Sequence, residues 1–373
     1  MRKRIIPYFT LILVVLISTL AFWSPFLFRQ NSWFGLSIPN SNFLYIYRHY
    51  DGPLYAVVAK TLYNPQLIEK FPLDLSFDVK YFSAHLPLYP LLIRLFAPIF
   101  NYSKSTIFIN VISTIILAMF FYYLVKQFKL TKHPIILTSV FLMLPRFLVV
   151  RSIGAPESLF ILFILTSLFF FEKEKYLLAG LFGGLATMTK TPGILLFVAY
   201  SFVFFENKHK FKLQSLFIFL IPLGLLGVFG IYGVQYKDFS AYFHSGDNIH
   251  LVAPFAAFNG QSRWVGTAWL EDIIFYFFIY LLAVISLKDS KYRSFFYFGL
   301  VFFIVTIFIQ HRDIGRYSLP LWSLACIAFE RFFTSKKFLI ALAILFPAIY
   351  LYAWNFSLQN MMPVSDWSHF FSR

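Results

Sequence analysis

Residues 5–28 read IIPYFTLILVVLISTLAFWSPFLF, an almost wholly apolar stretch that decides the fold class. A hydrocarbon core of roughly 30 Å is crossed by about 20 helical residues, so this stretch is long enough to span a membrane. The basic start Met1-Arg2-Lys3-Arg4 is similar to the first part of a secretory signal. Because the apolar run is longer than in such signals and no small-residue cleavage site follows it, we expect an uncleaved anchor.

The whole chain has the composition of a membrane protein. Of its 373 residues, 59% are hydrophobic and 13% are charged, which excludes a soluble globular protein. The net charge of +16 would suit a nucleic-acid-binding protein, but the basic residues form short clusters between apolar runs. Such clusters are topology signals, because positively charged loops stay on the cytoplasmic side. We therefore predict an all-α polytopic membrane protein with no nucleic-acid partner.

The charge pattern orders the apolar runs into about eleven transmembrane helices. With the amino terminus cytoplasmic, basic clusters at 126–133, 172–175, 206–212, 288–293 and 334–337 all fall on the cytoplasmic side. A path shifted by one span would not place them there. The carboxyl terminus is then outside. The predicted spans are 5–28, 105–125, 134–150, 157–171, 175–188, 193–205, 213–236, 270–287, 294–310, 318–332 and 338–354.

We predict one integrated membrane domain over residues 1–373, because no repeat or polar linker of domain size divides the chain. Two outer segments, 29–104 and 237–268, are too short and too aromatic to be separate folded domains. The first is expected to hold interfacial helices, among them a short amphipathic helix at 53–63 that a proline opens. The apolar piece at 86–100 is also placed at the interface, since it is short and carries three prolines.

Ionisable side chains outside the basic clusters concentrate on the predicted outer side. Asp51 follows the first span, within Arg48-His49-Tyr50-Asp51-Gly52-Pro53. Lys190 lies between two hydrophobic helices, and Arg151 and Glu157 flank a short turn. Charges at membrane depth are costly and usually mark a site or a pathway. The alternative interpretation is a solvated rim of loop charges.

Asp51 and the outer cations fit a reaction in which a lipid phosphate is the leaving group. A leaving phosphate needs cations to take up negative charge, and an attacking hydroxyl needs a general base. Asp51 is the candidate base, and the candidate phosphate ligands are Arg151, Lys190, Arg312 and Arg316. The outer residues show no metal-ligand spacing, no nucleotide-binding glycine loop and no Gly-x-Ser-x-Gly elbow. We therefore predict no metal site and no cofactor, while a requirement for a divalent metal stays open.

Five segments, which occur in order over residues 48–320, carry a resemblance to a known family. They are Asp51-Gly52-Pro53-Leu54-Tyr55, Pro87-Leu88-Tyr89-Pro90-Leu91-Leu92-Ile93-Arg94, Pro156-Glu157-Ser158-Leu159-Phe160, residues 178–193, and Arg316-Tyr317-Ser318-Leu319-Pro320. In these features the chain resembles the PIG-V-type mannosyltransferases, which transfer the second mannose of the glycosylphosphatidylinositol anchor, and their prokaryotic relatives. It departs from them at Tyr50, where a Trp is usual, and at Ala84-His85-Leu86, where two Phe residues are common.

The resemblance implies a C-type glycosyltransferase fold, a polyprenyl-phosphate sugar as donor, and an active site on the outer face. It also implies that Asp51 is the catalytic base and that Glu157 and Arg316 match conserved elements of the family. We expect an inverting displacement on a lipid or glycan acceptor, in which the polyprenyl phosphate leaves toward Lys190, Arg312 and Arg316. The remaining candidate substrate-binding residues are Arg48, His49, His85, Tyr89, Arg151, His311 and Tyr317.

Several of these residues have a structural interpretation beside the functional one. His49 would hold Asp51 in place, Glu157 would stabilise the start of a helix, and His311 would form a local ion-paired turn with Asp313. For the whole chain, the alternative is a transporter or flippase of a lipid-linked or amphipathic solute, because outer charges between short helices also describe a half-open pathway. The transferase requires Asp51 to face the cations across an outward cavity, whereas transport requires a path to the cytoplasmic face.

Overall fold

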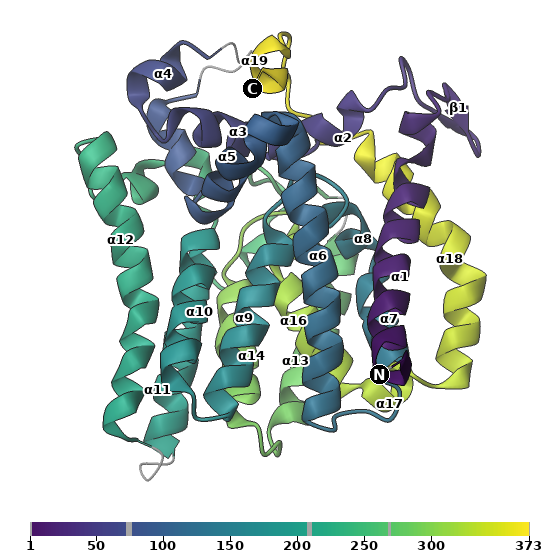
Figure 1. Ribbon diagram of the computed structural model, residues 1–373, viewed down its shortest axis with the longest axis vertical. Coiled ribbons are helices and arrows are strands. Elements are labelled where there is room, and N and C mark those ends of the chain that lie inside the picture. Colours follow the sequence, from purple (N-terminus) through teal and green to yellow (C-terminus); the bar gives the residue numbers. More distant parts are fainter. Residues whose placement is uncertain (1, 72–76, 207–210, 268–269, 373) are drawn as a thin grey trace.

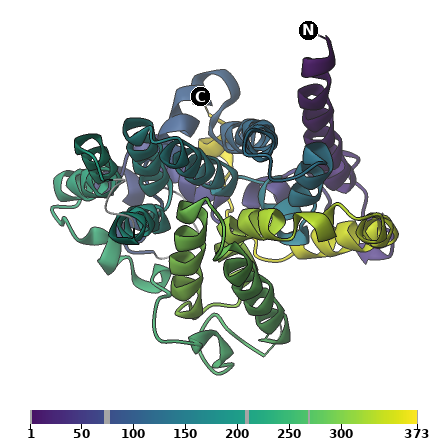
Figure 2. The same ribbon diagram turned by 90° about the horizontal axis from the view of Figure 1, so that it is seen from below.

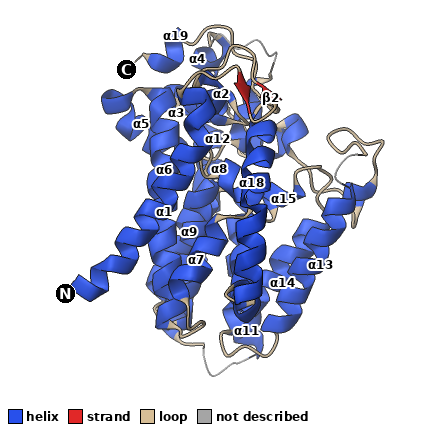
Figure 3. Ribbon diagram, turned by 90° about the vertical axis from the view of Figure 1, so that its right-hand side faces the viewer, coloured by secondary structure: helices blue, strands red, loops and turns tan. Residues whose placement is uncertain are grey.

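The structure is a computed structural model that describes residues 2–71, 77–206, 211–267 and 270–372. Parts of the predicted loops 29–104 and 237–268, and of the basic cluster at 206–212, lie outside the described residues. Helices make up most of the described chain, and a short two-stranded hairpin lies near one end of the molecule (Figure 3). The predicted helical fold is therefore confirmed in its main feature.

Long apolar helices pack side by side in a bundle (Figure 1). Seen from below, α13 and α14 stand together on one side of the molecule, away from α1 (Figure 2). The helices of the bundle are α1 (Arg2–Leu27), α6 (Tyr102–Gln127), α7 (Pro134–Leu142), α8 (Pro145–Val150), α9 (Glu157–Glu172), α10 (Tyr176–Thr189), α11 (Leu195–Glu206), α12 (Leu220–Gln235), α13 (Leu270–Leu287), α14 (Arg293–Ile307), α16 (Leu319–Ala328), α17 (Glu330–Phe333) and α18 (Lys336–Ser357).

Each predicted span overlaps one or two of these helices. Five of the described helical stretches are long and apolar enough to cross a membrane by themselves: 5–27, 102–127, 213–235, 270–287 and 336–357. Several of the others are apolar but shorter. The chain is thus a multi-pass membrane protein, and the number of eleven crossings stays a prediction.

Two predicted spans are interrupted. The span 134–150 consists of α7 and α8, which are separated at Met143 and Leu144. The interruption precedes Pro145, because a proline disfavours helical backbone at the residue before it. The span 213–236 begins as a 3-10 helix, η4 (Leu213–Phe219), and continues as α12. Neither change alters the path of the chain through the bundle.

One end of the bundle has short loops between helices, whereas the other end has several short helices and a hairpin (Figure 1). The start of α1 lies at one end, together with the loops that follow α6, α9, α13 and α17. These loops carry predicted cytoplasmic clusters, so the clusters share one end; which side of a membrane this end faces stays a prediction. The opposite end, which we call the site end, holds β1 (Ser32–Trp33), β2 (Leu36–Ser37), α2 (Leu44–Arg48), α3 (Gly52–Thr61), α4 (Pro65–Glu69), η1 (Val79–Ala84), α5 (Leu88–Phe100) and α19 (Ser368–Phe371).

Helices α3 and α5 belong to the first of the two segments predicted to lie outside. The segment 86–100 forms the short helix α5, which exposes Leu95 and Ile99 on one face and buries Ile93 and Ala97 on the other, as an interfacial helix does. The prediction of an amphipathic helix at 53–63 is wrong in its burial. Helix α3 occupies this place, but nine of its ten residues are buried, because α5 and α6 pack against it. It is an internal support for the loop that precedes it.

Candidate active site

Asp51 stands at the start of α3, where an aspartate often hydrogen-bonds the first turn of the helix. Its side chain makes no such hydrogen bond. Its Oδ2 instead accepts a hydrogen bond from Nη2 of Arg316 at 3.2 Å, and the side chain is 33% exposed. The carboxylate is therefore available to a substrate.

Glu157 binds two cations that come from different parts of the chain. Its Oε1 accepts hydrogen bonds from Nε of Arg316 at 2.7 Å and from Nζ of Lys190 at 2.9 Å. The Glu157 side chain is 2% exposed, and a carboxylate at this depth needs such partners. Glu157 is also the first residue of α9, where a carboxylate stabilises the start of a helix. The same residue therefore has the predicted position at the helix start and is the partner of both cations.

The position of Lys190 follows from a break between two helices. Helix α10 ends at Thr189, and the chain continues through η2 (Thr191–Ile194) into α11. A Cβ atom on Gly193 would lie 2.5 Å from the backbone nitrogen of Thr187, so this turn requires glycine. Lys190 leaves the break with extended backbone, and its Nζ lies 5.8 Å from the centre of the Tyr317 ring.

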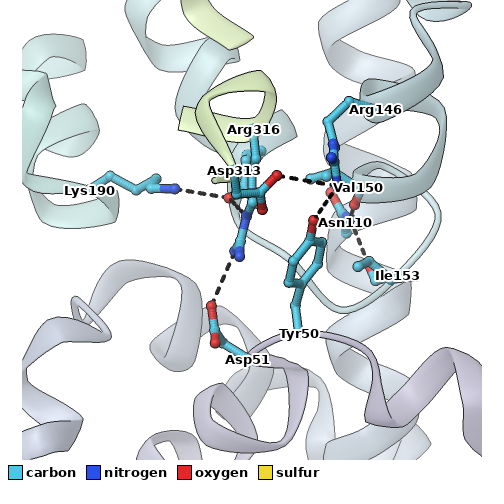
Figure 4. A network of polar contacts seen from close by, with 10 residues as sticks. Tyr50, Asp51, Asn110, Arg146, Val150, Ile153, Lys190, Asp313 and Arg316 are labelled. Atoms are coloured by element: carbon cyan, nitrogen blue, oxygen red, sulfur yellow. Dashed lines mark hydrogen bonds and ion pairs between the residues drawn. The ribbon is translucent and has the colours of Figure 1, made fainter. Parts of the chain in front are cut away.

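The two acids are brought close because their loops pack backbone against backbone. A Cβ atom on Gly52 would lie 3.3 Å from the carbonyl oxygen of Gly154, within the turn that leads to Glu157. Asn110 of α6 holds this turn, since its buried amide nitrogen donates to the carbonyl oxygens of Val150 at 2.8 Å and Ile153 at 2.6 Å (Figure 4). The close approach of the two loops thus rests on contacts that involve no charge.

A second ion pair lies beside the first. Arg146 of α8 donates through Nη1 to the Tyr50 hydroxyl at 2.8 Å and pairs with Asp313 at 3.2 Å. Asp313 directly precedes α15 (Ile314–Tyr317), the short helix that carries Arg316. The guanidinium carbon of Arg316 lies 4.2 Å from the centre of the Tyr50 ring, a cation–π distance. Tyr50 therefore contacts both arginines (Figure 4).

Two cavities meet at Asp51 and Arg316. The apolar cavity, of about 180 Å³, is lined by Phe160, Ile161, Phe302, Val305, Ile309 and Leu319, with Asp51, His85, Glu157, Lys190, Arg316 and Tyr317 on its polar side. The polar cavity, of about 460 Å³, is lined by Tyr50, Asp51, Arg146, Arg263, Trp264, His311, Arg312, Asp313, Arg316, Tyr317 and Asn360, among others. The Asp51–Arg316 pair thus lies on the boundary between an apolar space and a polar one.

The surroundings set the protonation of the groups at this boundary. Burial alone would raise the pKa of Asp51, but the Arg316 guanidinium beside it brings that pKa below its ordinary value. Burial lowers the pKa of His85 to about 4 and that of His311 to about 4. At neutral pH the site therefore presents an ionised Asp51 and the neutral imidazoles of His85 and His311.

The structure brings together most of the predicted site residues. Asp51, His85, Glu157, Lys190, Arg316 and Tyr317 line the apolar cavity, and His311 and Arg312 line the polar cavity. The predicted ion-paired turn of His311 with Asp313 differs in detail. His311 accepts the backbone N–H of Asp313 through Nδ1 at 2.9 Å, while the Asp313 carboxylate pairs with Arg146.

Four predicted residues line neither of these two cavities. Three of them, His49, Tyr89 and Arg151, are fully buried, which argues against their expected substrate contacts, while the contact expected of Arg48 stays a prediction. The His49 ring is fully buried against Tyr50 and Phe356. Nε of Arg48 donates to the carbonyl oxygen of Met362 at 3.1 Å. The buried Tyr89 donates its hydroxyl to the Thr106 carbonyl at 2.6 Å and packs against Tyr55. The fourth residue, Arg151, is fully buried; its guanidinium donates to Ser18 at 2.7 Å, Thr19 at 3.0 Å and the Leu142 carbonyl at 3.2 Å.

We expect Arg151→Met to reduce stability and to leave substrate binding unchanged. The guanidinium connects the end of α8 to α1, and its loss removes three hydrogen bonds at a buried position. The expected cost is about 1–3 kcal/mol, to be measured as a lower unfolding temperature in detergent. A weaker affinity for a lipid-phosphate ligand in a normally stable variant would restore the original assignment of Arg151.

Arg146 and Asn360 line the polar cavity although neither was among the predicted site residues. Arg146 lies inside the predicted span 134–150, and a charge within an apolar span is itself a signal of function or of a buried partner. Asn360 offers no such signal, because its side chain is uncharged and it lies far from Asp51 in the sequence.

The multi-pass helical bundle matches the expected C-type glycosyltransferase fold, and comparisons with known proteins confirm the expected resemblance. Residues 84–232 match the family described as dolichyl-phosphate-mannose-protein mannosyltransferase. The chain is 28% identical over 131 residues to GPI mannosyltransferase 1 of Saccharomyces cerevisiae, a match that covers 32% of each protein.

Two solved structures share the fold. ArnT from Cupriavidus metallidurans, solved with undecaprenyl phosphate bound, aligns with a TM-score of 0.57 at 13% identity over 90% of this chain and 63% of ArnT. The oligosaccharyltransferase of Archaeoglobus fulgidus, tethered to an acceptor peptide, aligns with a TM-score of 0.54 at 14% identity over 95% of this chain and 56% of that enzyme. This chain therefore spans less than two thirds of each of these relatives.

Proposed function

We propose that this protein is a membrane glycosyltransferase that moves a sugar from a polyprenyl-phosphate donor to an acceptor hydroxyl, with inversion at the anomeric carbon. The observation that carries this proposal is the accessible Asp51 carboxylate, 3.2 Å from Arg316, at the boundary of the two cavities. Mannose is the first candidate sugar, because the matching family and the yeast relative are both mannosyltransferases by name. The site end is proposed to face outward.

The apolar cavity suits the lipid donor. Its apolar wall comes from α9, α14 and α16, and its polar side holds Lys190 and Arg316. A polyprenyl chain would lie along the apolar wall with its phosphate at the two cations. ArnT, which shares the fold, binds undecaprenyl phosphate, a ligand of this chemical kind.

The charges of the site suit a reaction that moves a proton and releases a phosphate. Asp51 and Glu157 carry two negative charges and Lys190 and Arg316 carry two positive charges, so the group is neutral before the reaction. When the acceptor hydroxyl attacks the anomeric carbon, Asp51 takes its proton, and the bond between that carbon and the phosphate oxygen breaks with its electron pair on oxygen. The four side chains then carry one net positive charge, which stabilises the charge that develops on the phosphate.

The polar cavity suits the acceptor. It shares Asp51 and Arg316 with the apolar cavity, and the part of its wall that the apolar cavity lacks holds Trp264 and Arg263 along with His311 and Arg312. Aromatic faces and hydrogen-bonding groups of this kind bind sugar rings and polar head groups. Arg312 belongs to this side of the site, so we place it near the acceptor and assign the leaving phosphate to Lys190 and Arg316.

The transporter remains the alternative function. Both cavities that contain Asp51 are lined by residues near the site end of the bundle, which favours a reaction at one surface over passage through the protein. Incubation of the purified protein with a panel of labelled polyprenyl-phosphate sugars and lipid or glycan acceptors tests the choice. Transfer or donor hydrolysis supports the enzyme, whereas vesicle uptake of an unmodified lipid-linked solute without any cleavage would support transport.

We expect Lys190→Met to weaken use of the donor more than use of the acceptor. The substitution keeps the length of the side chain and removes one of the two cations at the phosphate position, so the KM for donor should rise by about ten-fold or more. Steady-state kinetics with each substrate varied in turn measure the difference. Lys80→Met is the matched control, because Lys80 lies at the same end but pairs with Asp238. An equal change in both KM values would contradict the role of Lys190.

A further inference from the structure

The chain returns from α18 to cross the loop that carries Asp51. Residues 358–362, which we call the strap, follow the end of α18 and run antiparallel to residues 48–50. The Tyr50 N–H donates to the Asn360 carbonyl at 2.9 Å, and the Met362 N–H donates to the Arg48 carbonyl at 2.8 Å. Between these two bonds, His49 and Met361 face each other as an antiparallel bridge. The strap is thus paired with the loop on both sides of His49.

Asn360 joins the strap to the opposite wall of the polar cavity. Its backbone lies in the left-handed region at φ +54°, where asparagine is better tolerated than most residues. Its carbonyl accepts the Tyr50 N–H, and its Oδ1 accepts a hydrogen bond from Nη2 of Arg312 at 2.9 Å. One residue therefore connects the Asp51 loop to the segment that precedes Arg316.

The loop needs such support because Tyr50 has an unfavourable backbone. Its φ of +51° is rare for an aromatic residue, and a residue of this kind keeps the conformation only when its surroundings impose it. The strap holds the Tyr50 amide, Arg146 holds its hydroxyl, and Arg316 contacts its ring. Asp51 is the next residue, so the conformation at Tyr50 sets the direction in which the Asp51 carboxylate points.

We propose that the strap positions Asp51 for catalysis, with Asn360 as the residue that fixes the strap in place. Gln359, Asn360, Met361 and Met362 also line the polar cavity, so the strap forms part of the wall on the proposed acceptor side. It does not line the apolar cavity. A defect in the strap should therefore lower kcat and alter the KM for acceptor, while the KM for donor stays the same. This kinetic consequence rests on the proposed transferase function.

Three substitutions at Asn360 separate its two contributions. Asn360→Ala disfavours the left-handed backbone and removes the Arg312 contact, and we expect kcat to fall by about 10–100-fold, as small displacements of a catalytic group do. Asn360→Gly keeps the backbone but loses the contact, so its loss should be smaller. Asn360→Asp keeps both features and should retain most of the activity. A folded Asn360→Ala protein with wild-type kcat, or one whose only change is a higher KM for donor, would overturn the proposal.

Hydrogen exchange provides a readout that does not depend on activity. Asn360→Ala should speed exchange of the amides at residues 48–52 and leave those of α9 and α10 unchanged. If the wild-type protein transfers no sugar from any donor, the proposed function fails, and the exchange result alone decides whether the strap orders the loop. Unchanged exchange at 48–52 would refute this ordering.

A cross-link covers the case in which Asn360→Ala does not fold. The double variant His49→Cys/Met361→Cys places two cysteines at facing positions of the bridge, while the single native cysteine, Cys326, is buried. If the strap stays on the loop throughout the reaction, the oxidised protein should be as active as the reduced one. Loss of activity on oxidation that a reductant reverses would show that the strap must leave the loop, which contradicts a fixed positioning role.

Discussion

Asp51→Asn should abolish sugar transfer, with a loss of about 10²–10⁴-fold, the usual contribution of a positioned general base. The amide has the size of the carboxylate and can still contact Arg316, but it cannot take a proton from the acceptor. It also leaves the site with one net positive charge before the reaction, so no charge is released toward the phosphate as the bond breaks. Donor affinity should therefore stay equal to or exceed that of the wild type. Transfer assays at saturating donor, together with a binding assay for the donor, measure both quantities.

The control for this variant is Asp238→Asn, at the same end of the molecule. Asp238 pairs with Lys80 and His244 and lines neither of the two cavities at Asp51. The Asp238→Asn substitution should therefore leave the transfer rate unchanged.

The pH dependence of the wild-type enzyme gives a further check. Since Arg316 brings the pKa of Asp51 below its ordinary value, the wild-type rate should show no decrease attributable to this base between neutral and mildly acidic pH. If the Asp51→Asn variant transfers sugar at the wild-type rate, Asp51 is not the general base.

The helices of this protein were predictable because apolar runs of helical length separated by basic clusters leave few alternatives. The burial of α3 could not be predicted in this way, because a sequence pattern does not show which other elements cover a helix. Its nine buried residues owe their burial to α5 and α6, and the pattern that predicted an interfacial helix contains no information on these contacts.

The site residues were predicted from the rule that ionisable side chains within a membrane are energetically costly and usually mark a functional site. This rule does not show which hydrogen-bond or ion-pair partners such a side chain has. The rule identified Asp51, Lys190 and Arg316, which line the cavities. It also identified Arg151, which is fully buried and donates its three hydrogen bonds to Ser18, Thr19 and the Leu142 carbonyl, away from both cavities. The strap was missed for a different reason. Its hydrogen bonds to the loop are largely between backbone groups, and residues with almost any side chain can form such bonds.

Glu157→Gln should give the largest loss of stability among single substitutions at the site. Glu157 is the shared partner of Arg316 and Lys190, and its removal leaves two cations near the end of the bundle with only Asp51 to balance them. Removing one member of a buried ion pair costs about 3–5 kcal/mol, because the remaining charge stays buried without its partner. Lys190 is 19% exposed, so water will offset part of this cost and the lower end of the range applies. Thermal unfolding in detergent measures the loss.

A second substitution separates this electrostatic explanation from simple damage to packing. Lys190→Met in the Glu157→Gln background removes the excess positive charge, so the double variant should be more stable than Glu157→Gln alone, while it still uses the donor poorly. Glu174→Gln is the matched control, since Glu174 pairs with Lys212 where both side chains are more than half exposed, and such pairs contribute about 0–1 kcal/mol. If the double variant is less stable than Glu157→Gln, the carboxylate acts through its shape and hydrogen bonds and not through its charge. The group of two acids and two cations would then no longer explain how the site balances the charge of a leaving phosphate.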